Sequence, residues 1–134
     1  MVGIDIGATK TLTLVVNEAG EVAGSCKVPT LKDKRPDKML EIIAETVDKA
    51  LASSGIKKKR IGAVGVGAPA PVDIKKGIVY YATNLGWHNV PLKSKLEKLL
   101  GLQVFADNDV NMGTRGEYVL GAGRGTNDFV GFFV

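Results

Sequence analysis

The order of apolar segments constrains the fold of this chain more than any other feature of its sequence. Val2–Ile6 and Thr11–Val16 are short apolar runs joined by a tight turn, and Glu21–Pro29 follows as a third predicted strand. Asp37–Ser54 then carries apolar residues at helical spacing, and Ile61–Val66 is an apolar run of strand length. A strand, a helix and a strand in this order predict a right-handed crossover and a parallel pair of strands.

The second half of the chain contains two more predicted helices and two more predicted strands. In the order helix, strand, helix, strand, they are Pro91–Leu100, Leu102–Ala106, Val110–Leu120 and Phe129–Val134. Before them, Ile74–Tyr81 is predicted as a small extended turn and Asn84–Asn89 as irregular chain. The complete pattern predicts an α/β domain with a mixed sheet of order βββαβαβ and flanking helices.

Composition and charge exclude several classes of protein. Cys26 is the only cysteine and His88 the only histidine, which excludes an intrachain disulfide and a cysteine-based metal cluster. No segment reaches the ~20 apolar residues of a membrane helix, and Val2 begins a strand without a secretory leader, so we expect a cytoplasmic protein. The net charge is +4, and the basic run Lys57–Arg60 is interpreted as a solvated connection rather than a nucleic-acid surface.

The turn between the first two predicted strands is the first candidate site. Small, hydroxylated and basic residues follow one another there: Gly7, Ala8, Thr9, Lys10 and Thr11. Successive backbone N–H groups in such a turn can bind an anion, and small side chains let a phosphate approach the backbone. Asp5 is a carboxylate inside an apolar strand, and beside nucleotide phosphates it would hold Mg²⁺ through water. The alternative is an ordinary hairpin in which Asp5 caps the turn.

The second candidate site follows the predicted strand Leu102–Ala106. In open α/β sheets, ligands bind at the carboxyl ends of the strands, where Asp109 could accept a proton from a substrate hydroxyl. Asn108 beside it could hydrogen-bond a neighbouring hydroxyl, which would give a polyol two points of contact. The alternative is that Asp107 or Asn108 only caps the helix that follows.

Two further segments are of interest. Gly65–Asp73 ends in a proline-containing loop that follows a strand, so the loop lies at the same edge of the sheet as Asp109. Thr83–Trp87 combines two polar side chains with an aromatic ring, and its alternative role is a loop whose Trp87 packs on the core. A dinucleotide-binding fingerprint is not present in either glycine-rich segment. In Gly65–Asp73, prolines occupy the positions where a helix should start, and a predicted helix, not a strand, precedes Gly121–Gly125.

Taken together and in this order, these motifs resemble the ROK family of sugar kinases, within the actin, Hsp70 and hexokinase-like superfamily. The matching segments cover essentially the whole chain: Asp5–Lys10, Gly67–Asp73, Asn84–Trp87, Asn108–Asn111, Gly116–Glu117 and Gly121–Gly125. The resemblance implies an RNase H-like (actin-like ATPase) fold of two lobes, with ATP and a sugar bound in the cleft between them. Residues 1–134 would be the N-terminal lobe.

The resemblance also implies a role for each candidate residue. Asp109 would be the catalytic base for the sugar hydroxyl, and Asp5–Thr11 the first phosphate loop, with Mg²⁺ held at Asp5. The residues that would bind the sugar or line its pocket are Asn108, Asn84, Thr83 and Ala70. The chain departs from the family pattern at Ala8 and Ala70, where glycine is usual.

The implied function is ATP-dependent phosphorylation of a hexose, with glucose favoured and Mg²⁺ as cofactor. By the same resemblance, the second phosphate loop, the adenosine pocket and any structural zinc belong to a C-terminal lobe, and the complete protein is a homodimer without nucleic-acid or membrane partners. The alternatives are a ROK sugar-responsive transcription regulator and a non-catalytic actin-like ATP-binding protein. A regulator carries a helix-turn-helix ahead of the kinase-like part, for which a strand at Val2 leaves no room. A non-catalytic protein would not need Asn108 beside Asp109.

Overall fold

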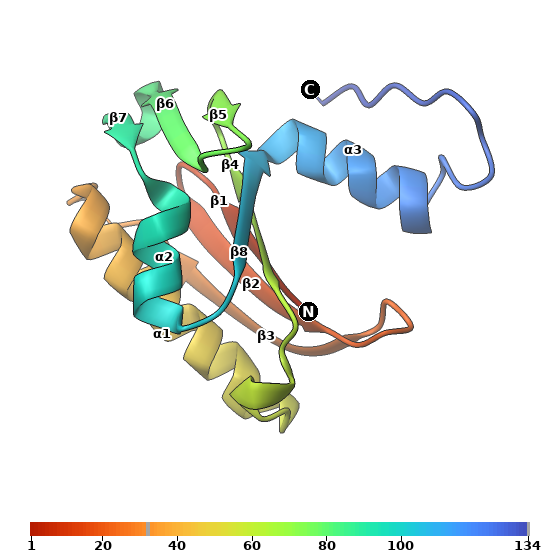
Figure 1. The fold of residues 1–134 in the computed structure, drawn as a ribbon, viewed down its shortest axis with the longest axis horizontal. Helices are drawn as coiled ribbons and strands as arrows, with labels where there is room; N and C mark the ends of the chain where they lie inside the picture. The colour runs from red at the N-terminus through yellow and green to blue at the C-terminus, as the bar shows by residue number, and fades with distance from the viewer. Residues whose placement is uncertain (32, 134) are drawn as a thin grey trace.

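A five-stranded mixed sheet occupies the centre of the computed structural model, which describes residues 1–31 and 33–133 (Figure 1). Its strands lie in the order β3-β2-β1-β4-β8. Their bounds are β1 Val2–Ile6, β2 Lys10–Val16, β3 Val22–Pro29, β4 Val64–Ala68 and β8 Val104–Asn108. β2 pairs antiparallel with β1 and β3, whereas β1, β4 and β8 are parallel. The predicted mixed α/β sheet is confirmed, although β4 and β8 begin later than expected.

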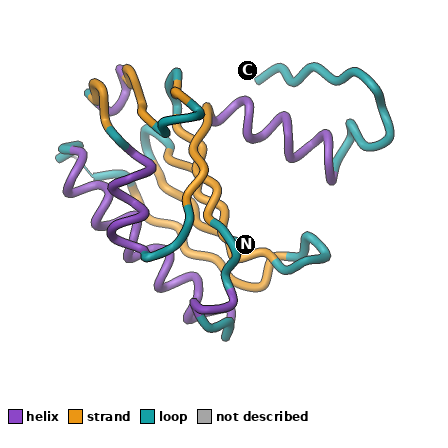
Figure 2. Tube along the Cα trace, in the orientation of Figure 1, coloured by secondary structure: helices purple, strands orange, loops and turns teal. Residues whose placement is uncertain are grey.

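In the described part of the chain, three α-helices flank this sheet: α1 Pro36–Ser54, α2 Leu92–Leu100 and α3 Asp109–Leu120. Figure 2 shows α1 and α2 together on one side of the sheet and α3 on the other. α1 begins at Pro36, whose restricted φ suits a first turn. It ends at Ser54, and the C-cap residue Gly55 has a left-handed φ of 68°. No helix among the described residues is long and apolar enough to cross a membrane.

The main core lies between the sheet and the layer formed by α1 and α2. Side chains alternate between the two faces of a strand, so Val2, Ile4 and Ile6 of β1 all point into this core and are at most 4% exposed. The intervening Gly3 and Asp5 therefore face the opposite side of the sheet, where α3 begins. Burial of apolar surface contributes roughly 25 cal/mol per Å² to stability, so apolar side chains occupy the core and the Asp5 carboxylate lies outside it.

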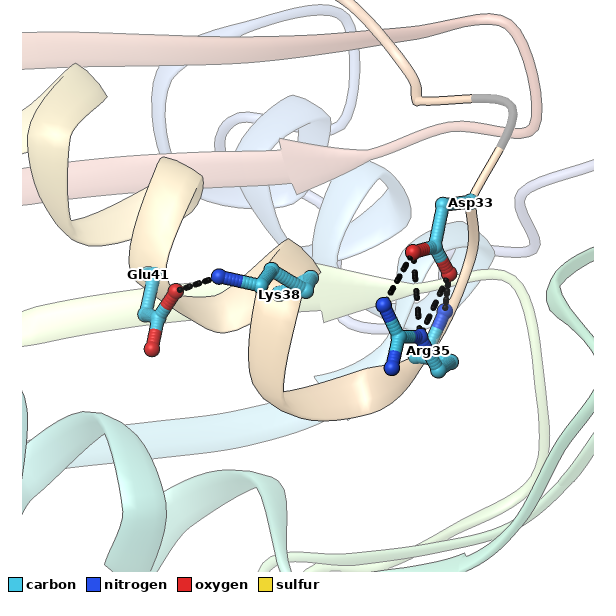
Figure 3. Close-up of polar contacts among 4 residues, drawn as sticks. All are labelled: Asp33, Arg35, Lys38 and Glu41. Atoms are coloured by element: carbon cyan, nitrogen blue, oxygen red, sulfur yellow. Dashed lines mark hydrogen bonds and ion pairs between the residues drawn. The ribbon is translucent and has the colours of Figure 1, made fainter.

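Two ion pairs lie at the start of α1, one just before the helix and one on its first turns (Figure 3). Arg35 donates to both carboxylate oxygens of Asp33, with the shortest contact at 2.6 Å, and Lys38 pairs with Glu41 at 3.2 Å on the first turns of the helix. The hydrogen bonds from Arg35 lower the pKa of Asp33. All four side chains are exposed, and surface pairs of this kind contribute little to stability.

A second sheet of three strands forms where the sequence indicated irregular chain. Its strands are β5 Val72–Asp73, β6 Ile78–Ala82 and β7 Trp87–Val90, in the order β5-β6-β7. The extended turn predicted for Ile74–Tyr81 corresponds to the β5–β6 turn and most of β6. The prediction of irregular chain for Asn84–Asn89 was wrong from Trp87 onward, because β7 pairs with β6. Asn is a poor strand former, so this pairing and the complete burial of Trp87 decide the local structure.

The strand predicted to begin at Phe129 is not formed. Residues 129–133 are irregular and run back beside α3 (Figure 2), and position 134 of that prediction lies outside the described residues. A Cβ on Gly113 would lie 2.6 Å from the Phe133 ring, and the rings of Phe129 and Tyr118 are 6.4 Å apart. A strand needs a neighbouring strand to satisfy its backbone groups, and none pairs with this segment in the described chain.

Candidate active site

The carboxyl ends of β1, β4 and β8 meet at one edge of the main sheet, because these strands are parallel (Figure 1). Each strand is followed there by a segment singled out in the sequence: Gly7–Thr9 after β1, Pro69–Pro71 after β4, and Asp109 after β8. The strand register aligns Asp5, Gly67 and Asp107 in one row across the three strands. The structure therefore brings the two main candidate sites to the same edge, where open α/β sheets bind their ligands.

Asp5 and Asp109 line one cavity of about 440 Å³ on the face of the sheet opposite α1. Asp109 is half-buried as the first residue of α3, and its Oδ1 accepts the Val110 N–H at 2.9 Å. Gly67 lies against it: a Cβ on Gly67 would be only 3.3 Å from the Asp109 Cα. The missing side chain of Gly67 thus allows α3 to start directly on the sheet, in the same cavity as Asp5.

The electrostatics of this cavity disfavour a charge on Asp5. Partial loss of solvent around the carboxylate raises the pKa of Asp5, the negative charge of Asp109 raises it further, and Lys10 opposes both effects. A divalent cation near the two carboxylates would relieve their repulsion. No group of three metal-binding side chains is assembled among the described residues, so the carboxylate of Asp5 fits Mg²⁺ that keeps most of its own waters.

Asn108 is the N-cap of α3. Its Oδ1 accepts the N–H groups of Val110 and Asn111 at 2.9 and 3.2 Å, and its Nδ2 donates to the Ala70 carbonyl at 3.2 Å. The capping role that the sequence left as an alternative is therefore present in Asn108. An amide nitrogen carries two hydrogens, so these contacts leave one for a substrate hydroxyl. Asp107 is not the cap, because its carboxylate accepts the Asn108 N–H and the Asn111 side chain.

Thr83 and Asn84 are exposed and begin a short 3₁₀ helix, Thr83–Leu85. The Asn84 carbonyl accepts the Lys34 ammonium at 2.6 Å, and the Trp87 indole donates to the Lys34 carbonyl at 2.8 Å. These two bonds tie the loop before α1 to the segment implied to line the sugar pocket. Sequence reasoning did not single out Lys34, because its partners lie 50 and 53 residues away and no local pattern signals them.

Ala70, Thr83 and Asn84, which were predicted to line the sugar pocket, do not line the cavity between β1 and α3. Its described lining contains neither Thr83 nor Asn84. Ala70 is buried and also lies outside that lining, but its carbonyl reaches the start of α3 through Asn108. The structure thus brings the predicted base and the predicted Mg²⁺ residue together, and one hydrogen bond links Ala70 to Asn108, the neighbour of the predicted base.

The predicted phosphate turn closes through the Gly7 N–H, which donates to the Lys10 carbonyl at 2.9 Å. A Cβ on Gly7 would lie 2.7 Å from that carbonyl oxygen, so glycine is required here. Ala8 is half-buried, and Thr9 and Lys10 are exposed. Thr11 is 2% exposed and faces α1, which contradicts the prediction that its hydroxyl serves the same ligand. The alternation of β2 turns this side chain into the core.

Known proteins similar to this chain include glucokinases and a xylose repressor. A glucokinase of Halalkalibacterium halodurans is 35% identical over 129 residues, which cover 96% of this chain and 39% of that protein. A glucokinase of Streptomyces coelicolor is 37% identical over 129 residues, which cover 96% of this chain and 38% of that protein. A xylose repressor of Caldicellulosiruptor bescii is 28% identical over 130 residues, which cover 97% of this chain and 33% of that protein. The chain thus spans about two fifths of the length of the glucokinases it matches.

Among solved structures, a ROK family glucokinase from Streptomyces griseus in complex with glucose and AMPPNP aligns with a TM-score of 0.84 and 38% identity, over 93% of this chain and 38% of that chain. A ROK hexokinase from Thermus thermophilus aligns with a TM-score of 0.83 and 31% identity, over 93% of this chain and 40% of that chain. These alignments confirm the predicted RNase H-like (actin-like ATPase) fold. The family model for ROK proteins matches residues 1–134, and the chain therefore belongs to the ROK family.

Proposed function

We propose that the protein containing this chain transfers the γ-phosphoryl group of ATP to a hydroxyl of a hexose, with glucose as the favoured sugar. The observation that carries the proposal is the position of Asp109, a half-buried carboxylate at the carboxyl end of β8 in one cavity with Asp5. The Gly7–Lys10 turn lies at the same edge of the sheet. The similarity to a glucokinase crystallised with glucose and AMPPNP supports the choice of both substrates.

In this proposal Asp109 is the base for the sugar hydroxyl. The hydroxyl oxygen forms a bond to the γ-phosphorus, the bond from that phosphorus to the ADP oxygen breaks, and the hydroxyl proton passes to a carboxylate oxygen of Asp109. Asn108 keeps Asp109 in place by capping α3 and offers its remaining amide hydrogen to a neighbouring hydroxyl. Phosphoryl transfer depends chiefly on such positioning and on charge stabilisation.

The Gly7–Lys10 turn and Asp5 serve the nucleotide. The backbone N–H groups of the turn and the Lys10 ammonium oppose the negative charge of the phosphates. A bound Mg²⁺ would supply further neutralisation of the phosphate charge. Asp5 would hold that ion through water, which suits a single carboxylate at the edge of an open cavity.

We also propose that residues 1–134 form the N-terminal lobe of a two-lobed enzyme, which acts as a homodimer in the cytoplasm. Within the described chain no residue of α3 is buried, and large apolar side chains on α3 and after it are exposed: Tyr118, Val119, Leu120, Val130 and Phe132. Apolar surface of this extent is normally covered by another part of the protein or by a partner. A second lobe laid against α3 would cover it and form the opposite wall of the nucleotide site.

A sugar-responsive transcription regulator is the second candidate, because a xylose repressor is among the proteins similar to this chain. Both functions require sugar binding, but only the kinase requires a base beside the phosphate turn. A screen of the complete protein against a panel of hexoses, with ADP release as the readout, separates the two. Release of ADP with one sugar supports the kinase, whereas sugar binding without ADP release and tight binding to DNA supports the regulator.

The substitution Asp109→Asn tests the proposed base directly. We expect kcat of the complete protein to fall at least ~100-fold, the usual contribution of a positioned base, while sugar binding measured by calorimetry is retained. Asp48→Asn is the matched control, because Asp48 is an exposed carboxylate on α1 that pairs with Lys58 at 3.5 Å, outside the cavity. Wild-type turnover in the Asp109→Asn protein would refute the assignment.

A further inference from the structure

We propose that Thr30 is a positioning residue of the phosphate site. From the end of β3 it locks the Gly7–Lys10 turn in the orientation that presents backbone N–H groups to a nucleotide phosphate. Thr30 itself does not touch the ligand in this scheme. The inference rests on the function proposed for the turn, and it gives a role to a residue outside every motif that the sequence singled out.

Thr30 makes two hydrogen bonds to the turn. Its Oγ1 donates to the Gly7 carbonyl at 2.7 Å, and its backbone N–H donates to the Thr9 carbonyl at 2.9 Å. The hydroxyl bond is partly buried and joins residues 23 positions apart, so it is a tertiary contact and not local turn geometry. The two bonds continue the pairing of β2 with β3 beyond Lys10 and Pro29, the last residue pair of that ladder.

The planarity of the peptide bond converts these contacts into an orientation of the whole turn. In a trans peptide, the C=O of one residue and the N–H of the next point in opposite directions. Thr30 holds the Gly7 and Thr9 carbonyls, so the N–H groups of Ala8 and Lys10 point away from Thr30. Of these two groups, the Ala8 N–H donates to no acceptor in the part of the chain that the structure describes. This amide is therefore available to an anion.

The other contacts of the turn do not fix this orientation. The hydrogen bond from the Gly7 N–H to the Lys10 carbonyl closes the hairpin. The Gly7 N–H belongs to the Ile6–Gly7 peptide, so this bond does not hold the next peptide, Gly7–Ala8. Glycine is required at Gly7 by the close approach of the Lys10 carbonyl, and glycine also permits the largest range of backbone rotation. Without the Thr30 hydroxyl, the Gly7 carbonyl can rotate toward the ligand, where its partial negative charge would repel a phosphate.

The substitution Thr30→Val removes the hydroxyl and keeps the size and β-branching of the side chain. We expect the Kd for Mg–AMPPNP and the KM for ATP to rise roughly 3- to 10-fold, the usual effect of one lost hydrogen bond, with sugar affinity unchanged. Thr30→Ser retains a hydroxyl and is expected to restore nucleotide affinity. Thr126→Val is the matched control, because the Thr126 hydroxyl also donates to a glycine carbonyl at 2.7 Å, that of Gly123, in the turn after α3.

Calorimetry on the complete protein measures nucleotide and sugar binding for the wild type and the three variants. A loss confined to the nucleotide, restored by Thr30→Ser and absent in Thr126→Val, supports the inference. Unchanged nucleotide affinity in Thr30→Val overturns it, and so does an equal loss of nucleotide and sugar affinity, because a general structural role would produce that result. This readout needs no turnover, so the inference can fail while the protein remains a sugar kinase. A wild-type protein that binds no Mg–AMPPNP would overturn the function proposed for the turn and this inference with it.

Amide hydrogen exchange on the wild-type protein supplies a test that does not depend on the folding of any variant. We expect Mg–AMPPNP to slow exchange at the N–H group of Ala8, because a bound phosphate would accept its hydrogen bond. Exchange at Ala8 that is indifferent to the nucleotide would overturn the inference.

Discussion

Asp5 brings a negative charge into a cavity that already contains Asp109. Partial burial and the neighbouring charge raise the pKa of Asp5, so the folded protein holds this proton more tightly than the unfolded chain does. The stability contributed by the protonated carboxyl is present at low pH and is lost as the pH rises through the folded-state pKa. At neutral pH the ionised Asp5 therefore destabilises the fold, as expected for a residue that serves the proposed nucleotide site and not stability.

Asp5→Asn is expected to raise the melting temperature of the complete protein at about pH 7 and to lower its kinase activity. At about pH 3, below the ordinary Asp pKa of ~3.9, the wild-type carboxyl is protonated and the two proteins should melt alike. Asp37→Asn is a control of opposite sign, because the hydrogen bond from Lys95 lowers the pKa of Asp37 and its ionised form stabilises the fold. A lower melting temperature for Asp5→Asn than for the wild type at neutral pH would contradict the electrostatic account.

At the scale of elements, the packing of α3 on β4 decides where Asp109 lies. A methyl group on Gly67 would meet the Asp109 Cα at 3.3 Å, so Gly67→Ala should push the start of α3 away from the sheet. We expect kcat to fall roughly 3- to 10-fold with the fold retained, because a contact at 3.3 Å displaces the reacting group by only a fraction of an ångström. Steady-state kinetics and circular dichroism would measure the two effects.

The control for this substitution is Gly62→Ala, just before β4 and outside the cavity. A Cβ on Gly62 meets nothing within 4 Å, so the extra methyl group enters open space and kcat should be unchanged. Equal losses of activity in Gly62→Ala and Gly67→Ala would show that the effect comes from replacing a glycine near β4 and not from the position of α3.

At the scale of the whole molecule, the proposed cleft needs walls on both sides of the nucleotide. Asp5, Asp109 and the Gly7–Lys10 turn all belong to the wall that this chain supplies. Residues 1–134 expressed alone are therefore expected to release ADP at the background rate, whereas the complete protein turns over. A coupled assay of ADP release, with circular dichroism to verify that the isolated segment is folded, measures this difference. Turnover by residues 1–134 at the rate of the complete protein would refute the two-lobe proposal.

Local sequence patterns were sufficient where an element depends on its near neighbours. α1 was expected over Asp37–Ser54 and lies at Pro36–Ser54 in the structure. The agreement is close because helical spacing and a glycine after the last turn are local signals. The strand Trp87–Val90 was missed because it forms by pairing with β6, and the strand expected from Phe129 is absent because no strand pairs with it in the described chain. Thr11 had the right chemistry for a donor, but strand alternation directs it into the core.

By itself, the sequence determined the α/β order of elements, the polar residues at the strand ends and the family resemblance, because these follow from residue type and spacing along the chain. Only the tertiary structure decided which of these residues meet. It sets Asp109 against Gly67, joins Asn108 to Ala70 across 38 positions, and lets Thr30 hold a turn 23 positions away. Such contacts arise when α3 and β3 pack or pair with strands formed elsewhere in the chain, so no local stretch of sequence contains them.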